Sequence, residues 1–224
     1  MPKSTTSPDD DNPKPILLKA LEIILADPAQ IKREATNLLS KYEKRYKQDR
    51  TNDDIRELVA NKIIQNYSYM SAFSGGATAL AGVVPGLGTI VASFGGATAD
   101  IALCMKFQVE LVMALATIYE HNIETEEGKR LCFIIAGLGA INNATQQGAK
   151  EVGTQAFTKL AKQYLKGPSL LAVKGVFKKV GIAFTRKSLE KAIPFGVGTF
   201  ISFSVNKTLT WYVGKTARDF FQTN

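Results

Sequence analysis

The chain has 224 residues, of which 45% are apolar and 21% charged, and its formal net charge is +8. This length accommodates one large domain or at most two small ones, and the composition is that of a soluble or peripheral membrane protein. Its two cysteines, Cys104 and Cys132, exclude a disulfide-rich scaffold and lack the spacing of a metal site. We therefore expect buried free thiols and a reducing cytoplasm.

The positive charge is concentrated in the last third of the chain. From Lys150 to Asn224 there are thirteen lysines and arginines against three acidic residues, and the preceding segment is slightly acidic. An anionic partner such as a lipid surface or a nucleic acid would explain this asymmetry. A solvated basic face without a dedicated partner would also explain it.

The chain divides into three regions by composition. Residues 1–14 are polar and proline-rich and lack the apolar core of a signal peptide, so we predict a disordered tail. Residues 15–50 predict amphipathic or charged N-terminal helices. Residues 51–224 predict a helical domain.

The N-terminal region contains two helical patterns, at residues 16–25 and at about 28–48. Asp27 is a favourable N-cap for the second helix, and Pro28 suits its first turn. The next helix is expected to begin at Asn52, where two acidic residues follow and complement the helix dipole.

No charged residue occurs between Ile63 and Ala99, and this stretch is interrupted by Pro85-Gly86-Leu87-Gly88. A related interruption, Pro194-Phe195-Gly196-Val197-Gly198, occurs near the C-terminus. We predict long Gly/Ala-rich helices that are broken at both places, because Pro and Gly end helices. None of these segments offers the roughly 20 apolar residues of a full membrane span. A helix hairpin that packs in a core or dips into one leaflet fits their lengths.

Helical patterns also cover the rest of the chain. They predict a long helix from about residue 89 to 121, a helix after Thr125, a basic segment at 169–187 and a terminal helix to about Phe221. Short alternating strand patterns bounded by turn residues do not occur. The predicted fold class is all-α, as a single helical bundle.

The chain shows no catalytic or nucleotide-binding motif. Its only histidine, His121, is expected to complement a helix C-terminus. Gly82, Gly86 and Gly88 lack the Lys-Ser/Thr pair of a phosphate-binding loop. We therefore expect a non-enzymatic protein with no metal or cofactor.

Asp100 lies within a long apolar helix, where a buried carboxylate must be hydrogen-bonded or paired. It either bonds to a group on a neighbouring helix or serves as the polar anchor of a ligand cavity. The other residues predicted to line this cavity are glycines of the two breaks and an asparagine of the terminal helix: Gly86, Gly88, Gly196, Gly198 and Asn206.

Residues 173–187 predict a basic amphipathic helix. Such a helix can lie on an anionic leaflet, where each cation contributes about 1 kcal/mol, although its apolar face could instead pack on the core. The predicted membrane-binding residues are the cations of this helix and large apolar residues of the two breaks: Lys174, Lys178, Lys179, Arg186, Leu87, Phe195 and Val197.

Several motifs, in order, make residues 55–222 resemble the EcsC family of bacterial proteins. They are an uncharged Gly/Ala helix at 71–84, the first break, Asp100 before an apolar helix with Gln108, Ala116-x-Ile118-Tyr119, the second break with Asn206, and Gly214-x-x-Ala217-Arg218-x-Phe220. The family often has Gly after the tyrosine, where this chain has Glu120. The resemblance implies a helical, membrane-associated protein with no established enzymatic activity.

The leading hypothesis is a non-enzymatic helical protein on the inner face of an anionic membrane, with a lipid or other apolar ligand between its helices. One alternative is a scaffold or adaptor whose basic C-terminal face binds another protein or, less favoured, a nucleic acid. A second alternative is a bacterial effector that inserts into membranes. The identity of the ligand and the oligomeric state stay open.

Overall fold

The computed structural model describes most of the N-terminal half of the chain and the C-terminal helix, namely residues 20, 23–125, 127–129, 131–133, 135–136 and 203–223. The predicted basic helix at 169–187 and the second break lie outside the described residues. With them lie eight predicted site residues: Lys174, Lys178, Lys179, Arg186, Phe195, Gly196, Val197 and Gly198.

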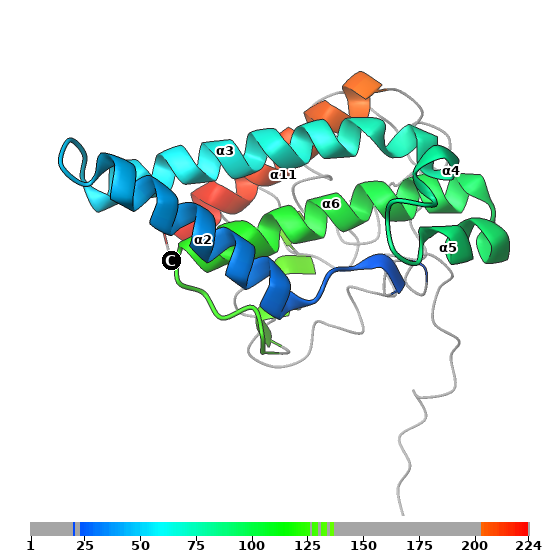
Figure 1. Ribbon diagram of the computed structural model, residues 1–224, viewed down its shortest axis with the longest axis horizontal. Coiled ribbons are helices and arrows are strands. Elements are labelled where there is room, and N and C mark those ends of the chain that lie inside the picture. Colours follow the sequence, from blue (N-terminus) through cyan, green and yellow to red (C-terminus); the bar gives the residue numbers. More distant parts are fainter. Residues whose placement is uncertain are drawn as a thin grey trace, which may run out of the picture.

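The described part is helical and contains no strand, which confirms the all-α prediction. Its helices, in chain order, are α2 (Pro28–Tyr46), α3 (Asn52–Ala72), η1 (Phe73–Gly76), α4 (Ala77–Leu80), α5 (Leu87–Phe94), α6 (Gly96–Ile118) and α11 (Phe203–Gln222). Figure 1 shows α3 and α6 running along the molecule, with the short helices α4 and α5 at one end.

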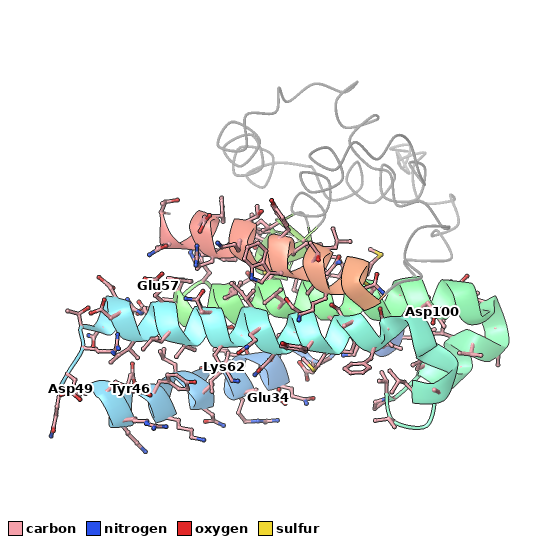
Figure 2. All side chains as sticks on the ribbon, turned by 90° about the horizontal axis from the view of Figure 1, so that it is seen from above. Glu34, Tyr46, Asp49, Glu57, Lys62 and Asp100 are labelled. Atoms are coloured by element: carbon pink, nitrogen blue, oxygen red, sulfur yellow. The ribbon has the colours of Figure 1, made fainter. Side chains whose placement is uncertain are left out.

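Helix α3 lies between α2 and α11 when the bundle is seen from above (Figure 2). It runs antiparallel to α11, because Tyr69 meets Lys207 near one end and Asn61 meets Arg218 near the other. Gly214 of α11 allows this close approach, since a Cβ at that position would lie 2.7 Å from Ile64 Cγ1 and 3.1 Å from a Leu111 methyl group on α6.

The helix starts follow local capping rules. The Asp27 carboxylate accepts a hydrogen bond of 2.9 Å from the Ala29 amide, as predicted for an N-cap. At α3 the N-cap is Thr51, one residue before the predicted start, and it forms a reciprocal capping box with Asp54. The hydrogen bonds from Thr51 lower the pKa of the Asp54 carboxyl group.

The predicted helix from residue 89 to 121 is wrong in one respect, because it is two helices. Gly95 adopts φ 83° and separates α5 from α6, in a conformation that residues with a Cβ rarely take. Gly86, with φ 80°, forms the N-cap of α5 and packs against Ile23. The first predicted break is therefore a turn whose backbone lies close to the segment before α2.

The buried apolar residues of the described part form two clusters. The larger joins α2, α3, α6 and α11 through buried residues such as Ile31, Val59, Leu111 and Val213. The smaller lies under α5 and the N-terminal half of α6, and Ala20 and Ile24 from the segment before α2 belong to it: Ala20, Ile24, Leu87, Ile90, Ala99, Ala102, Leu103 and Phe107.

One described segment, Thr98–Ile118, is long and apolar enough to cross a bilayer. Its most apolar window is 94% buried by the rest of the protein, as in the central helix of a soluble bundle. We therefore treat α6 as the core helix of the fold.

Candidate functional site

An open groove of about 820 Å³ lies over the outer surface of α3, between α2 and α11. Its lining combines cationic, aromatic and amide side chains from these three helices: Tyr42, Tyr46, Leu58, Asn61, Lys62, Ile64, Gln65, Ser68, Tyr69, Lys207, Trp211, Lys215 and Arg218. We call it the α3 groove.

Helical periodicity places these side chains. On α11, Lys207, Trp211 and Lys215 are four residues apart and therefore share one face. On α3, Gln65 and Tyr69 have the same spacing. The two rows face each other across the antiparallel pair of helices, and the α3 groove runs between them.

The α3 groove is cationic. Four of its lining residues are lysine or arginine, and none is acidic. Lys207 Nζ lies 3.9 Å from the ring centroid of Tyr69, and Lys215 Nζ lies 4.6 Å from that of Trp211. These cation–π contacts hold the lysines in place without neutralising them.

Arg218 is anchored more firmly. Its guanidinium donates a hydrogen bond of 3.2 Å to the Asn61 side-chain oxygen, and it pairs with Asp219 at 2.8 Å. By contrast, Lys62, Lys207 and Lys215 form no ion pair with any described residue. Among the described residues, only the charge of Arg218 is therefore compensated by a carboxylate in the α3 groove.

Ser68 lies deep in the lining and is 1% exposed. Within the described part of the chain its hydroxyl group has no hydrogen-bond partner. A buried hydroxyl without a partner costs free energy, which a bound polar group or water would recover. Ser68 is therefore an unsatisfied polar group beneath the groove.

Six large apolar side chains of the described residues are exposed, and four of them lie at the end of the bundle that carries α4 and α5. The most exposed are Val83 (74%) in the turn after α4 and Phe73 (60%) in η1. Tyr69 and Met70 lie in the last turn of α3, whereas Trp211 lies mid-way along α11 and Ile23 lies in the segment before α2. We call Tyr69, Met70, Phe73 and Val83 the apolar end.

Asn206, predicted for the ligand cavity, is buried in a polar contact between α11 and the end of α3. Its side-chain amide donates to Ser74 Oγ at 2.9 Å, and its main-chain carbonyl oxygen accepts from Ser71 Oγ at 3.1 Å. Nearby, the Gln108 amide lies 3.4 Å from Thr210 Oγ1 and 3.5 Å from Cys104 Sγ. These polar groups hold the helices together.

The described members of the predicted cavity do not meet. Gly86 packs on the segment before α2, Gly88 lies near the carbonyl of Ala81, and Asn206 is held by Ser74. Asp100 lies half-buried in the first turns of α6, at the end of the bundle near α5 (Figure 2). None of the four lines the α3 groove.

Leu87 requires a correction, because the sequence predicted it to insert into lipid. It is fully buried as the first residue of α5 and packs in the smaller core cluster. Once Gly86 turns the chain toward Ile23, the next side chain points inward. The exposed apolar residue of this region is Val83.

A buried ion pair went unnoticed in the sequence. Lys106 donates to Glu110 one turn later on α6, and both side chains are almost fully buried. The same Glu110 oxygen accepts a hydrogen bond of 2.8 Å from the Ala26 amide. The pair therefore fixes the segment before α2 to the core helix.

The titratable groups of the core favour structure over catalysis. Burial raises the pKa of the Cys104 thiol to about 12, and it does the same for Cys132. A thiol with so high a pKa is a poor nucleophile. Partial burial lowers the pKa of His121, whose ring lies 4.8 Å from that of Phe221.

The described residues contain no cluster of His, Cys, Asp and Glu that could hold a metal ion. The α3 groove can hold an anion, because it supplies ammonium, guanidinium and hydroxyl donors beside aromatic surface. Sequence reasoning placed the basic signal at 173–187 and missed this groove. The spacing Lys207-x₃-Trp211-x₃-Lys215-x₂-Arg218 could have indicated its α11 side.

Comparison with known proteins yields no relative: no family model, no curated protein and no solved structure matches the chain.

Proposed function

We propose that this protein is a non-enzymatic helical protein that binds peripherally to an anionic membrane surface through the apolar end of the bundle. The sequence resemblance to the EcsC family supports membrane association, and the basic character of the last third of the chain supports an anionic surface.

The observation that carries the proposal is the position of the four exposed side chains of the apolar end. Single exposed apolar residues are common on soluble proteins, whereas a group at one end is typical of an interaction site. Phe73 and Val83 are the most exposed of the four, and Tyr69 lies just before them in the last turn of α3. Trp and Tyr side chains are enriched where proteins meet the headgroup region of a bilayer.

The charges near this end fit an anionic leaflet. Lys207 lies over Tyr69 at this end, and Lys215 lies over Trp211 farther along α11. Each cation close to an anionic surface contributes about 1 kcal/mol, so apolar insertion and attraction of these lysines together give reversible binding.

Co-sedimentation with vesicles tests the proposal. The full chain is expected to bind vesicles of phosphatidylcholine with added phosphatidylserine and to bind pure phosphatidylcholine much more weakly. Replacing Phe73 and Val83 together by serine should weaken this binding about tenfold or more, since two inserted side chains are lost. Both side chains are exposed, so the F73S/V83S variant should keep its fold.

The matched control is F73W/V83I, which keeps apolar bulk at the same two positions. We expect it to bind as well as the original chain. Failure of the original chain to bind either kind of vesicle would refute the proposal, and so would equal binding by F73S/V83S and F73W/V83I.

A further inference from the structure

We propose that the α3 groove binds the headgroup of an anionic membrane lipid that ends in a phosphate monoester. The inference rests on the proposed membrane function and adds the site and the chemical class of its ligand.

The charge of the groove calls for more than one negative charge. Lys62, Lys215 and Arg218 border its part near Asn61, and Lys207 borders its part near Tyr69. Only Arg218 is paired with a described carboxylate. A phosphate monoester carries about −1.5 to −2 charges at neutral pH, whereas a carboxylate or phosphodiester carries one.

The donors suit a phosphate where they lie together, in the part of the groove near Asn61 that Lys62, Lys215 and Arg218 border. A phosphate monoester presents three strong acceptor oxygens. Lysine ammonium groups bind phosphate as point charges, and the planar guanidinium can hold two oxygens. Ser68, with its buried hydroxyl group, lies farther along the groove toward Tyr69.

The rest of the lining suits the apolar part of a lipid. Tyr69 belongs both to the groove and to the apolar end, so the groove reaches the end of α3 that carries Met70 and Phe73. From Leu58 to Tyr69 the groove follows about 16 Å of α3 at 1.5 Å per residue. A headgroup can therefore lie among the cations while its acyl chains reach the apolar end.

The same aromatic and cationic residues could suggest single-stranded nucleic acid, whose bases stack on open aromatic faces. One face of the Tyr69 ring is covered by Lys207, and one face of the Trp211 ring by Lys215. These contacts reduce the area available for stacking. The observations therefore favour a lipid headgroup.

Trp211 allows a direct test, because it is the only tryptophan of the chain and it lines the groove. The full chain is titrated with dihexanoyl phosphatidic acid as monomers, and Trp211 fluorescence is followed. We expect a saturable change and an affinity about tenfold higher than for dihexanoyl phosphatidylglycerol, which has a singly charged phosphodiester. Dihexanoyl phosphatidylcholine should give no saturable change.

Two variants locate the site. K62Q/K215Q removes two groove cations that form no ion pair with a described residue and should weaken the binding of phosphatidic acid about tenfold or more. K41Q/K44Q removes the same charge from exposed positions on α2 outside the lining and should leave the affinity unchanged. Since Lys215 lies over Trp211, the comparison uses dissociation constants rather than starting intensities.

Four results would overturn the inference. Equal affinity for phosphatidic acid and phosphatidylglycerol would refute the preference for a phosphate monoester. Equal weakening of binding by K62Q/K215Q and K41Q/K44Q would refute the groove as the binding site. Tighter binding of inorganic phosphate or of a single-stranded oligonucleotide would assign the groove to a soluble ligand. Vesicle binding with no Trp211 response would leave the membrane function standing and refute the groove, whereas saturation of Trp211 without vesicle binding would refute the membrane function.

Discussion

Lys207 on α11 lies over the ring of Tyr69 on α3, with 3.9 Å between the ammonium nitrogen and the ring centroid. The contact joins two helices that are far apart in the sequence, and it lies at the border of the α3 groove. It fixes the position of a cation that forms no ion pair with a described residue. The geometry of the groove therefore depends partly on this one cation–π pair.

A double-mutant cycle measures the pair. We expect Y69L and K207M, alone and combined, to give a coupling free energy of about 0.5–1 kcal/mol, the usual range for exposed cation–π contacts. Urea unfolding at equilibrium provides the free energies. The Y69F variant serves as the control and should keep the coupling, because the contact needs the ring and not its hydroxyl group. Full additivity of Y69L and K207M would contradict this expectation.

The starts of the N-terminal helices could be predicted from local sequence rules. Asp27, Pro28 and the acidic residues after Asn52 indicated where α2 and α3 begin, because capping depends on neighbours in the chain. Gly95 could not be recognised as a helix boundary, since a glycine inside a helical pattern is tolerated. Its φ of 83° is a consequence of how α5 folds back on α6.

The candidate site was harder to predict than the helices. Its cations and aromatic residues come from α2, α3 and α11, and the antiparallel pairing of α3 with α11 brings Tyr69 to Lys207 and Asn61 to Arg218. A single sequence contains no information on that pairing. The prediction that Leu87 is exposed was wrong for the same reason, since its burial depends on a contact between distant segments, that of Gly86 with Ile23.

Glu110 is expected to be the most sensitive polar position of the core. Replacing it by alanine leaves the buried Lys106 ammonium without its partner and the Ala26 amide without its acceptor. Breaking a buried ion pair in this way typically costs about 3–5 kcal/mol in the free energy of unfolding. Urea unfolding of E110A measures the loss.

The control for Glu110 replaces both partners. K106M/E110M removes the two charges together and should be clearly more stable than E110A, because no uncompensated charge stays buried. The Ala26 amide still loses its acceptor, so about 1 kcal/mol of destabilisation should remain. If the double variant were as unstable as E110A, the ion pair would not explain the loss.

Gly214 is expected to tolerate no side chain. An added Cβ would lie 2.7 Å from Ile64 Cγ1 and 3.1 Å from the Leu111 methyl group, which forces α11 away from α3 and α6. G214A should lose about 1–3 kcal/mol, although alanine otherwise favours a helix over glycine. Gly82 is the matched control, since it is exposed and a Cβ added there would have no neighbouring atom within 4 Å. A G214A protein as stable as G82A would contradict the packing of α11.

His121 should make the stability depend on pH in the weakly acidic range. Partial burial lowers its pKa below the usual value near 6.5, and the backbone hydrogen bond with Phe221 opposes this only in part. As the pH falls below about 6.5, the unfolded chain takes up a proton before the folded one, so stability is lost until the pH reaches the folded pKa. Because His121 is the only histidine, H121Q should flatten the melting temperature between about pH 7 and pH 5. A slope that is the same in H121Q would assign the effect to another group.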